Sequence, residues 1–161
     1  MILRIEDWEL SLNQTKTKAY SDAEAKCHCT CGYCRNFYEA VESAYPTLSA
    51  FLSNFGLNIF APDELIPYEP TLCDVSYGVC GSIQHYGEKR IQVDGLEITI
   101  EPWDQVSINS ECPKPCFVVT VHQLSLPWVL EESLEDVVSP AQEQSFLRRI
   151  WSRLVKKQNA N

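Results

Sequence analysis

The chain has no long hydrophobic run and no excess of positive charge. No segment approaches the roughly 18 consecutive apolar residues of a membrane-spanning helix. The formal net charge is −9, from 13 basic and 22 acidic side chains, which argues against binding nucleic acid phosphates or anionic lipid surfaces. We therefore expect neither a nucleic acid nor a membrane among the partners.

Familiar catalytic motifs are also missing. The sequence has no phosphate-binding loop, dinucleotide fingerprint, Gly-x-Ser-x-Gly elbow or His-Glu-x-x-His motif. His85 and His122 stand in segments typical of strands, without a nucleophile motif nearby, so we interpret them as sheet histidines rather than catalytic bases. The sequence favours a protein that is not an enzyme.

The N-terminus shows no export signal. Glu6 and Asp7 stand where a secretory signal would need a basic start and then roughly 7–15 apolar residues. We therefore expect a cytoplasmic protein. In a reducing cytoplasm, clustered cysteines are more often metal ligands or catalytic thiols than disulfides.

Cysteine is what the sequence does have, with eight in 161 residues. Four of them are crowded together as Cys27, Cys29, Cys31 and Cys34. Zinc prefers four tetrahedral ligands, and a Cys-x-x-Cys turn aims both of its sulfurs at one ion. Gly32 relieves the strain in that turn. The pattern predicts a zinc site.

The cluster predicts a set of four ligands. We expect Cys29, Cys31 and Cys34 to supply three sulfurs and a strand residue to supply the fourth, with Cys80 preferred and Cys73 as the alternative. The rigid loop between Cys112 and Cys116 can approach the same place. Cys27 is expected to be dispensable.

Other chemistry also fits these thiols. Cys31-Gly32-Tyr33-Cys34 resembles the active-site motif of thioredoxin-fold disulfide isomerases, which would make Cys31 the nucleophile and Cys34 the resolving thiol. The polar residues before the motif lack the apolar strand of that fold. An iron–sulfur cluster is a lesser alternative to zinc, and idle buried thiols are another. In an exported protein, Cys112–Cys116 and Cys73–Cys80 would be the first disulfides to test.

The pattern of apolar residues predicts helices near both ends of one domain, residues 1–161. Apolar side chains recur at helical spacing over about residues 33–55, a unit that Pro46 should break or bend and Gly56 should end. A second helix is predicted over about 140–157. We expect a strand and a polar loop over residues 1–26, before the first helical unit. An acidic linker is expected over residues 131–139, before the second helix.

Strands are predicted between the helices. Residues 77–86 and 117–124 are rich in β-branched and aromatic side chains, whereas three prolines make residues 61–70 an extended connector that cannot be a central strand. Residues 90–100 predict a β-hairpin around a type I′ turn at Asp94-Gly95. The predicted fold is therefore α+β, an antiparallel sheet packed against the two helical units.

Two short motifs carry a resemblance to a family. The run Cys29-x-Cys31-x-x-Cys34-Arg35-Asn36-Phe37, with Leu126-Pro127-Trp128-Val129-Leu130 farther on, resembles uncharacterised small bacterial proteins with these motifs. The resemblance implies a bacterial cytoplasmic origin and no particular activity. From the residues themselves we predict an acidic binding or interaction module with a structural zinc site. The alternatives are a thiol-disulfide oxidoreductase and a metal-free interaction or immunity-like protein that binds a protein partner.

Overall fold

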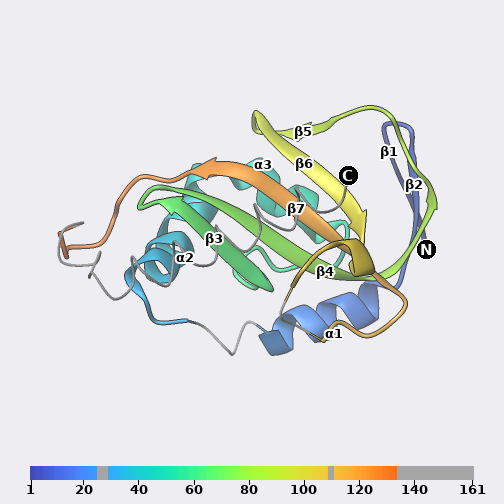
Figure 1. Cartoon of the computed structure of the whole chain (residues 1–161), viewed down its shortest axis with the longest axis horizontal. Helices are drawn as coiled ribbons and strands as arrows, with labels where there is room; N and C mark the ends of the chain where they lie inside the picture. The colour runs from blue at the N-terminus through green and yellow to red at the C-terminus, as the bar shows by residue number, and fades with distance from the viewer. Residues whose placement is uncertain (25–28, 109–110, 134–161) are drawn as a thin grey trace, which may run out of the picture. The chain divides into compact units, whose positions relative to one another are not determined.

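A computed structural model of the chain describes residues 1–24, 29–108 and 111–133 (Figure 1). The chain divides into one unit spanning Met1–Val129 and another spanning Leu130–Asn161, and everything described below belongs to the first. The predicted helix over 140–157 and most of the predicted linker over 131–139 lie outside the described residues. The single-domain organisation stays a prediction.

The α+β fold predicted from the sequence is confirmed. The strands are β1 Ile2–Ile5, β2 Trp8–Leu12, β3 Glu64–Glu69, β4 Leu72–His85, β5 Ile91–Val93, β6 Leu96–Pro102 and β7 Cys116–Ser125. The helices are α1 Gln14–Glu24, α2 Gly32–Ala44 and α3 Pro46–Ser53, with a short 3-10 helix η1 at Trp103–Gln105. The strands form one seven-stranded sheet in the order β1-β2-β4-β7-β6-β5, with β3 also paired to β4, and every pairing is antiparallel. None of the described helices is long and apolar enough to cross a membrane.

The long strand β4 organises the sheet, as its central course in Figure 1 shows. One of its edges pairs with β7 from Leu72 to Cys80. The opposite edge is shared, because β3 pairs with its first half and β2 with its last residues from Gly81 onward. A gap is left between β3 and β2, in which no strand of the described residues pairs with the backbone of β4.

Groups around helix α1 fill this gap. The Gly78 amide donates to the Asp63 carboxylate, and the Cys80 amide donates to the Thr17 hydroxyl at 3.0 Å. The Cys80 carbonyl accepts from the Asn13 amide at 2.8 Å. Asp63 also accepts a hydrogen bond from the Tyr20 hydroxyl. Buried backbone groups need such partners, so α1 and the residues beside it replace the missing piece of strand.

The expectation of a strand and a polar loop over residues 1–26 is wrong in two respects. Residues 2–12 form the hairpin β1–β2, which turns at Glu6 with a positive φ of 53°. Residues 14–24 form helix α1, which Asn13 caps by accepting from the Lys16 amide. Hydrophobic periodicity missed this helix because its inward positions are polar: Thr17 and Ser21 are fully buried and hydrogen-bonded.

The helical unit over 33–55 is confirmed as two helices that separate at Pro46. Pro46 is the first residue of α3, where its missing amide costs no hydrogen bond. Gly56 follows α3 with a φ of +84°, and a Cβ there would lie 2.7 Å from the Gln14 carbonyl oxygen. A glycine is therefore needed both for the turn and for the close approach of α1.

The strand predictions hold with one correction. The hairpin turns at Asp94 and Gly95, both with positive φ, as a type I′ turn requires. The strands at 77–86 and 117–124 are found as β4 and β7. The predicted connector over 61–70 instead contains β3, but that strand lies at an edge and pairs with β4 alone, which tolerates proline.

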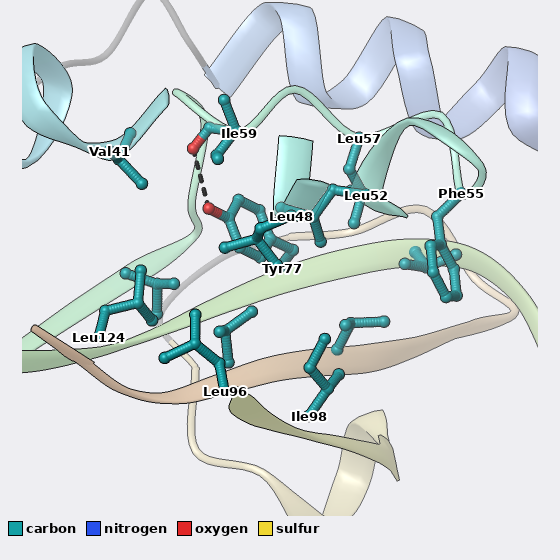
Figure 2. Close-up of a cluster of buried hydrophobic side chains, with 14 of the residues drawn as sticks. Val41, Leu48, Leu52, Phe55, Leu57, Ile59, Tyr77, Leu96, Ile98 and Leu124 are labelled. Atoms are coloured by element: carbon teal, nitrogen blue, oxygen red, sulfur yellow. Dashed lines mark hydrogen bonds between the residues drawn. The ribbon is translucent and has the colours of Figure 1, made fainter. Parts of the chain in front are cut away.

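The hydrophobic core lies between one face of the sheet and the helices α2 and α3 (Figure 2). Val41, Leu48 and Leu52 of the helices meet the odd-numbered residues of β4, among which Tyr77 is fully buried. Each such apolar side chain contributes about 1.5–3 kcal/mol on burial. The Tyr77 hydroxyl donates to the Ile59 carbonyl at 2.8 Å, so its polar end is satisfied inside the core.

The opposite face of the sheet carries a polar chain. His122 Nδ1 lies 2.9 Å from Asp74 Oδ2, and His122 Nε2 lies 2.9 Å from the Thr99 hydroxyl. The second Asp74 oxygen accepts from the Gln123 amide, at a bulge where Gln123 has a positive φ. The hydrogen bond between His122 and Asp74, together with the charges of neighbouring carboxylates including Glu101, raises the pKa of His122 against the opposing effect of burial.

Replacing Tyr77 tests the polar contact in the core. Tyr77→Phe leaves the Ile59 carbonyl buried without its donor, so we expect the free energy of unfolding to fall by about 1–2 kcal/mol. Urea denaturation followed by tryptophan fluorescence measures it. Tyr86→Phe, at an exposed tyrosine, serves as control and should change stability by less than about 0.5 kcal/mol. Equal effects of the two variants would contradict the role of Tyr77.

The His122–Asp74 pair predicts a pH dependence of stability. Because the folded pKa of His122 is raised, the stabilisation is complete below the unfolded value near 6.5 and is lost as pH rises through the folded pKa. Burial raises the pKa of Asp74, but its hydrogen bonds outweigh that effect and lower it, so its contribution is lost as pH falls through the folded pKa. The stabilisation of the folded state by the His122–Asp74 pair should be largest between about pH 4 and 6.5.

The variant His122→Gln keeps a polar side chain that does not titrate. Comparing it with the native protein measures the stabilisation by the His122–Asp74 pair. Urea denaturation of both proteins across pH 4–9 should give a difference of about 1 kcal/mol or less at the widest point, because the pair is partly solvated. The difference should shrink above neutral pH. A constant difference across the range would show that the pair is not coupled to protonation.

Candidate metal centre

The three predicted sulfur ligands gather at the start of helix α2. Cys31 is the N-cap residue, with an extended backbone, and its carbonyl accepts the first helical hydrogen bond from Arg35 at 3.0 Å. Cys34 lies in the first turn and Cys29 just before the helix. The three Sγ atoms all lie within 4.8 Å of one another. Gly32 opens the helix and is buried.

This spacing suits a thiophilic ion. Zinc binds thiolate sulfur at about 2.3 Å, so the sulfurs of a tetrahedral site lie about 3.8 Å apart. The observed separations, none above 4.8 Å, are close to that distance. The N-terminus of a helix carries a positive partial charge, which favours thiolates over thiols. The donor set therefore fits zinc or another soft metal.

Protonation in the cluster is uneven. A hydrogen bond from the Cys34 thiol lowers the pKa of Cys31 to about 5, against the opposing effect of burial. The same hydrogen bond, together with burial, raises the pKa of Cys34. Burial and then the charges of the nearby sulfurs raise the pKa of Tyr38 to about 12.

Exposure differs among the three sulfurs. Cys29 is exposed, whereas Cys31 and Cys34 are partly buried. A metal held here would lie at the surface, fixed from below by α2. Such a site is accessible to solvent and to a partner.

Cys80, predicted as the fourth ligand, does not join the cluster. Its sulfur lies 3.8 Å from that of Cys112 instead. Cys73 lines a small cavity together with Tyr33 and Phe37 of α2, and Cys80 lies seven residues farther along β4, roughly 23 Å away at strand spacing. The prediction of Cys80 is wrong because the strand is long and the half of it that carries Cys80 does not lie near α2.

Cys73 is nearer to α2 but is not a member of the three-sulfur cluster either. Its side chain packs in the hydrophobic core, and burial raises its pKa to about 12. It faces the core side of β4, whereas Cys80 faces the opposite side, so this fold rules out the disulfide between them that was predicted for an exported protein. Cys27 and His28 lie outside the described residues.

Asn36 connects the helix that carries the cluster to residues 127–129. Its side-chain amide donates to the Pro127 carbonyl at 3.0 Å, and its oxygen accepts from the Val129 amide at 2.8 Å. Asn36 is 2% exposed. The two short motifs noted in the sequence are therefore in direct contact, since one residue of the first holds the backbone of the second. Sequence reasoning singled out both motifs without seeing that they meet.

Comparison with known proteins gives no match, whether with family models, curated proteins or solved structures. The function must therefore be argued from the site itself.

Shortening Asn36 should separate the two motifs. Asn36→Ala removes both hydrogen bonds and leaves the Pro127 carbonyl and the Val129 amide without their partner, so we expect a loss of about 2–3 kcal/mol in the free energy of unfolding. Asn36→Asp keeps the acceptor for Val129 and loses only the donor to Pro127. Urea denaturation of the two variants and the native chain measures the loss. An Asn36→Ala variant as stable as the native protein would contradict this account.

Proposed function

We propose that the protein is a small interaction module in which zinc, held by Cys29, Cys31 and Cys34, fixes the start of helix α2. The observation that carries the proposal is the convergence of three sulfurs within 4.8 Å at a helix N-terminus. The chemistry of thiolates favours zinc over hard cations such as magnesium or calcium. A cytoplasmic location, where thiols stay reduced, belongs to the same proposal.

The fourth ligand is the open part of the site. Among the described residues, the cluster of ligand atoms contains these three sulfurs alone. Tetrahedral zinc therefore takes its fourth donor from solvent, from a partner or from a residue outside the described ranges. The exposure of Cys29 leaves that side of the ion within reach of a protein partner.

In this proposal, zinc holds the residues before α2 against the first turn of that helix. Cys29 and Cys31 precede the first turn of α2, and Cys34 lies within it, so one ion ties the incoming chain to the helix. Asn36, two residues beyond Cys34, holds the segment around Pro127. Metal binding therefore stabilises a surface built from two distant parts of the chain.

A second candidate is a thiol-disulfide oxidoreductase that uses Cys31 and Cys34. The observation in its favour is the position of Cys31 at the N-cap of α2 with the Cys34 sulfur close by, as a nucleophile and a resolving thiol require. The third sulfur, Cys29, has no task in that chemistry, which is why we prefer the metal. A metal-free interaction or immunity-like protein is the remaining alternative.

Metal content tests the proposal. We expect one zinc per chain in protein purified under reducing conditions, measured by elemental analysis. Cys31→Ser should weaken zinc binding at least about 100-fold, more than loss of a supporting contact does. It should also lower Tm by roughly 5 °C or more, since each kcal/mol moves Tm by about 2–4 °C at this size. Chelation of the native protein should have the same effect.

Cys116→Ser is the matched control, because it removes one partly exposed thiol outside the cluster. It should retain zinc and respond to chelation as the native chain does. Metal-free protein whose Tm is indifferent to chelation would refute the zinc site. In that case, reductase activity with a reversible Cys31–Cys34 disulfide would support the enzyme, and eight free thiols the metal-free interaction protein.

A further inference from the structure

A second group of three thiols lies on the face of the sheet opposite the core. Cys80 of β4 and Cys112 of the loop before β7 are 2% and 6% exposed, and their sulfurs are 3.8 Å apart. Cys116, the first residue of β7, is partly exposed, and its thiol lies 3.6 Å from the Cys112 carbonyl. The candidate zinc site uses none of these residues.

Cys80 and Cys116 oppose each other across β4 and β7. The Cys80 amide and carbonyl point away from β7, to Thr17 and Asn13, and the next residue, Gly81, donates to the Pro115 carbonyl. Cys80 and Cys116 therefore form a non-hydrogen-bonded pair, the kind in which Cα atoms approach to about 4.5 Å and the side chains are closest. Cys80 thus has one thiol opposite it and another beside it.

The fold holds Cys112 close to β4. Gly78 lies one pleat before Cys80 on the same face, and a Cβ on Gly78 would lie 3.1 Å from the Cys112 sulfur and 3.0 Å from the Trp103 ring. The absence of a side chain at Gly78 is what lets the loop reach the strand. Burial raises the pKa of both Cys112 and Cys116, so only a small fraction of each is the attacking thiolate near neutral pH.

We propose that Cys80, Cys112 and Cys116 form an oxidisable site in which a small disulfide enters at Cys116 and a Cys80–Cys112 disulfide results. The sulfurs of Cys80 and Cys112 need to close by less than about 2 Å to reach the S–S bond length of about 2.05 Å. The resulting bond joins the loop before β7 to the middle of the sheet.

The reaction proceeds by thiol–disulfide exchange. The Cys116 thiolate attacks one sulfur of oxidised glutathione, and one glutathione thiolate leaves. Cys80, opposite Cys116, attacks the Cys116 sulfur of this mixed disulfide and releases the second glutathione thiolate. Cys112 then attacks the Cys80 sulfur and frees Cys116. In sum, two protein thiols are oxidised to one disulfide, and one oxidised glutathione is reduced to two molecules of glutathione.

Incubation of the full chain with oxidised glutathione tests the site. Free thiols are then labelled with iodoacetamide, and chymotrypsin, which cleaves after Tyr77, separates Cys73 from Cys80. We expect one crosslink between the peptide with Cys80 and the peptide with Cys112 and Cys116, with the iodoacetamide label on Cys116. Two molecules of glutathione should be released for each Cys80–Cys112 disulfide formed, and reduction should reverse the change.

Two variants assign the roles. Cys116→Ser should react at least tenfold more slowly because the entry thiol is gone, and Cys112→Ser should stop at a Cys80–Cys116 disulfide. An unchanged rate in Cys116→Ser, a crosslink through Cys73, or full labelling of all three thiols after oxidation would overturn the proposal. Zinc measured before and after oxidation should not change, which separates this result from the fate of the candidate metal centre.

Discussion

The requirement that every backbone group of β4 find a partner shapes the whole fold. This strand is too long for any one neighbour, so β3 and β2 share one edge and leave a gap between them. Asp63, Thr17 and Asn13 supply the missing hydrogen bonds from side chains and from the start of α1. The position of α1 and the turn at Gly56 beside it depend on that substitution.

The two faces of the sheet have different uses. The core face is apolar and anchors α2 and α3, which fixes the helix start where Cys31 and Cys34 lie. The other face carries hydrogen-bonded polar groups and the second set of thiols around Cys80. One strand with alternating side chains therefore supports two separate groups of cysteines, one through the helices on its core face and one on its other face.

Much of this fold could be predicted from local sequence signals. The turn at Asp94-Gly95, the break at Pro46 and the three-sulfur cluster each depend on a few neighbouring residues, and each is found in the structure. Helix α1 escaped prediction because Thr17 and Ser21 bury polar groups where the pattern needs apolar ones. The prediction of the fourth ligand is wrong because the spacing of residues in the sequence does not show which half of a strand lies near a distant helix. No local sequence pattern predicts that the sulfurs of Cys80 and Cys112 lie close together.

The gap in the β4 edge also has a dynamic consequence. In most of a sheet, an amide exchanges its hydrogen with solvent only when neighbouring strands separate. The amides of Gly78 and Cys80 are protected instead by Asp63 and by Thr17 of α1. If α1 detaches while the sheet stays intact, the Cys80 amide loses its partner, although the strand residues on both sides keep theirs. Local opening of one helix is thereby transmitted to the centre of the longest strand.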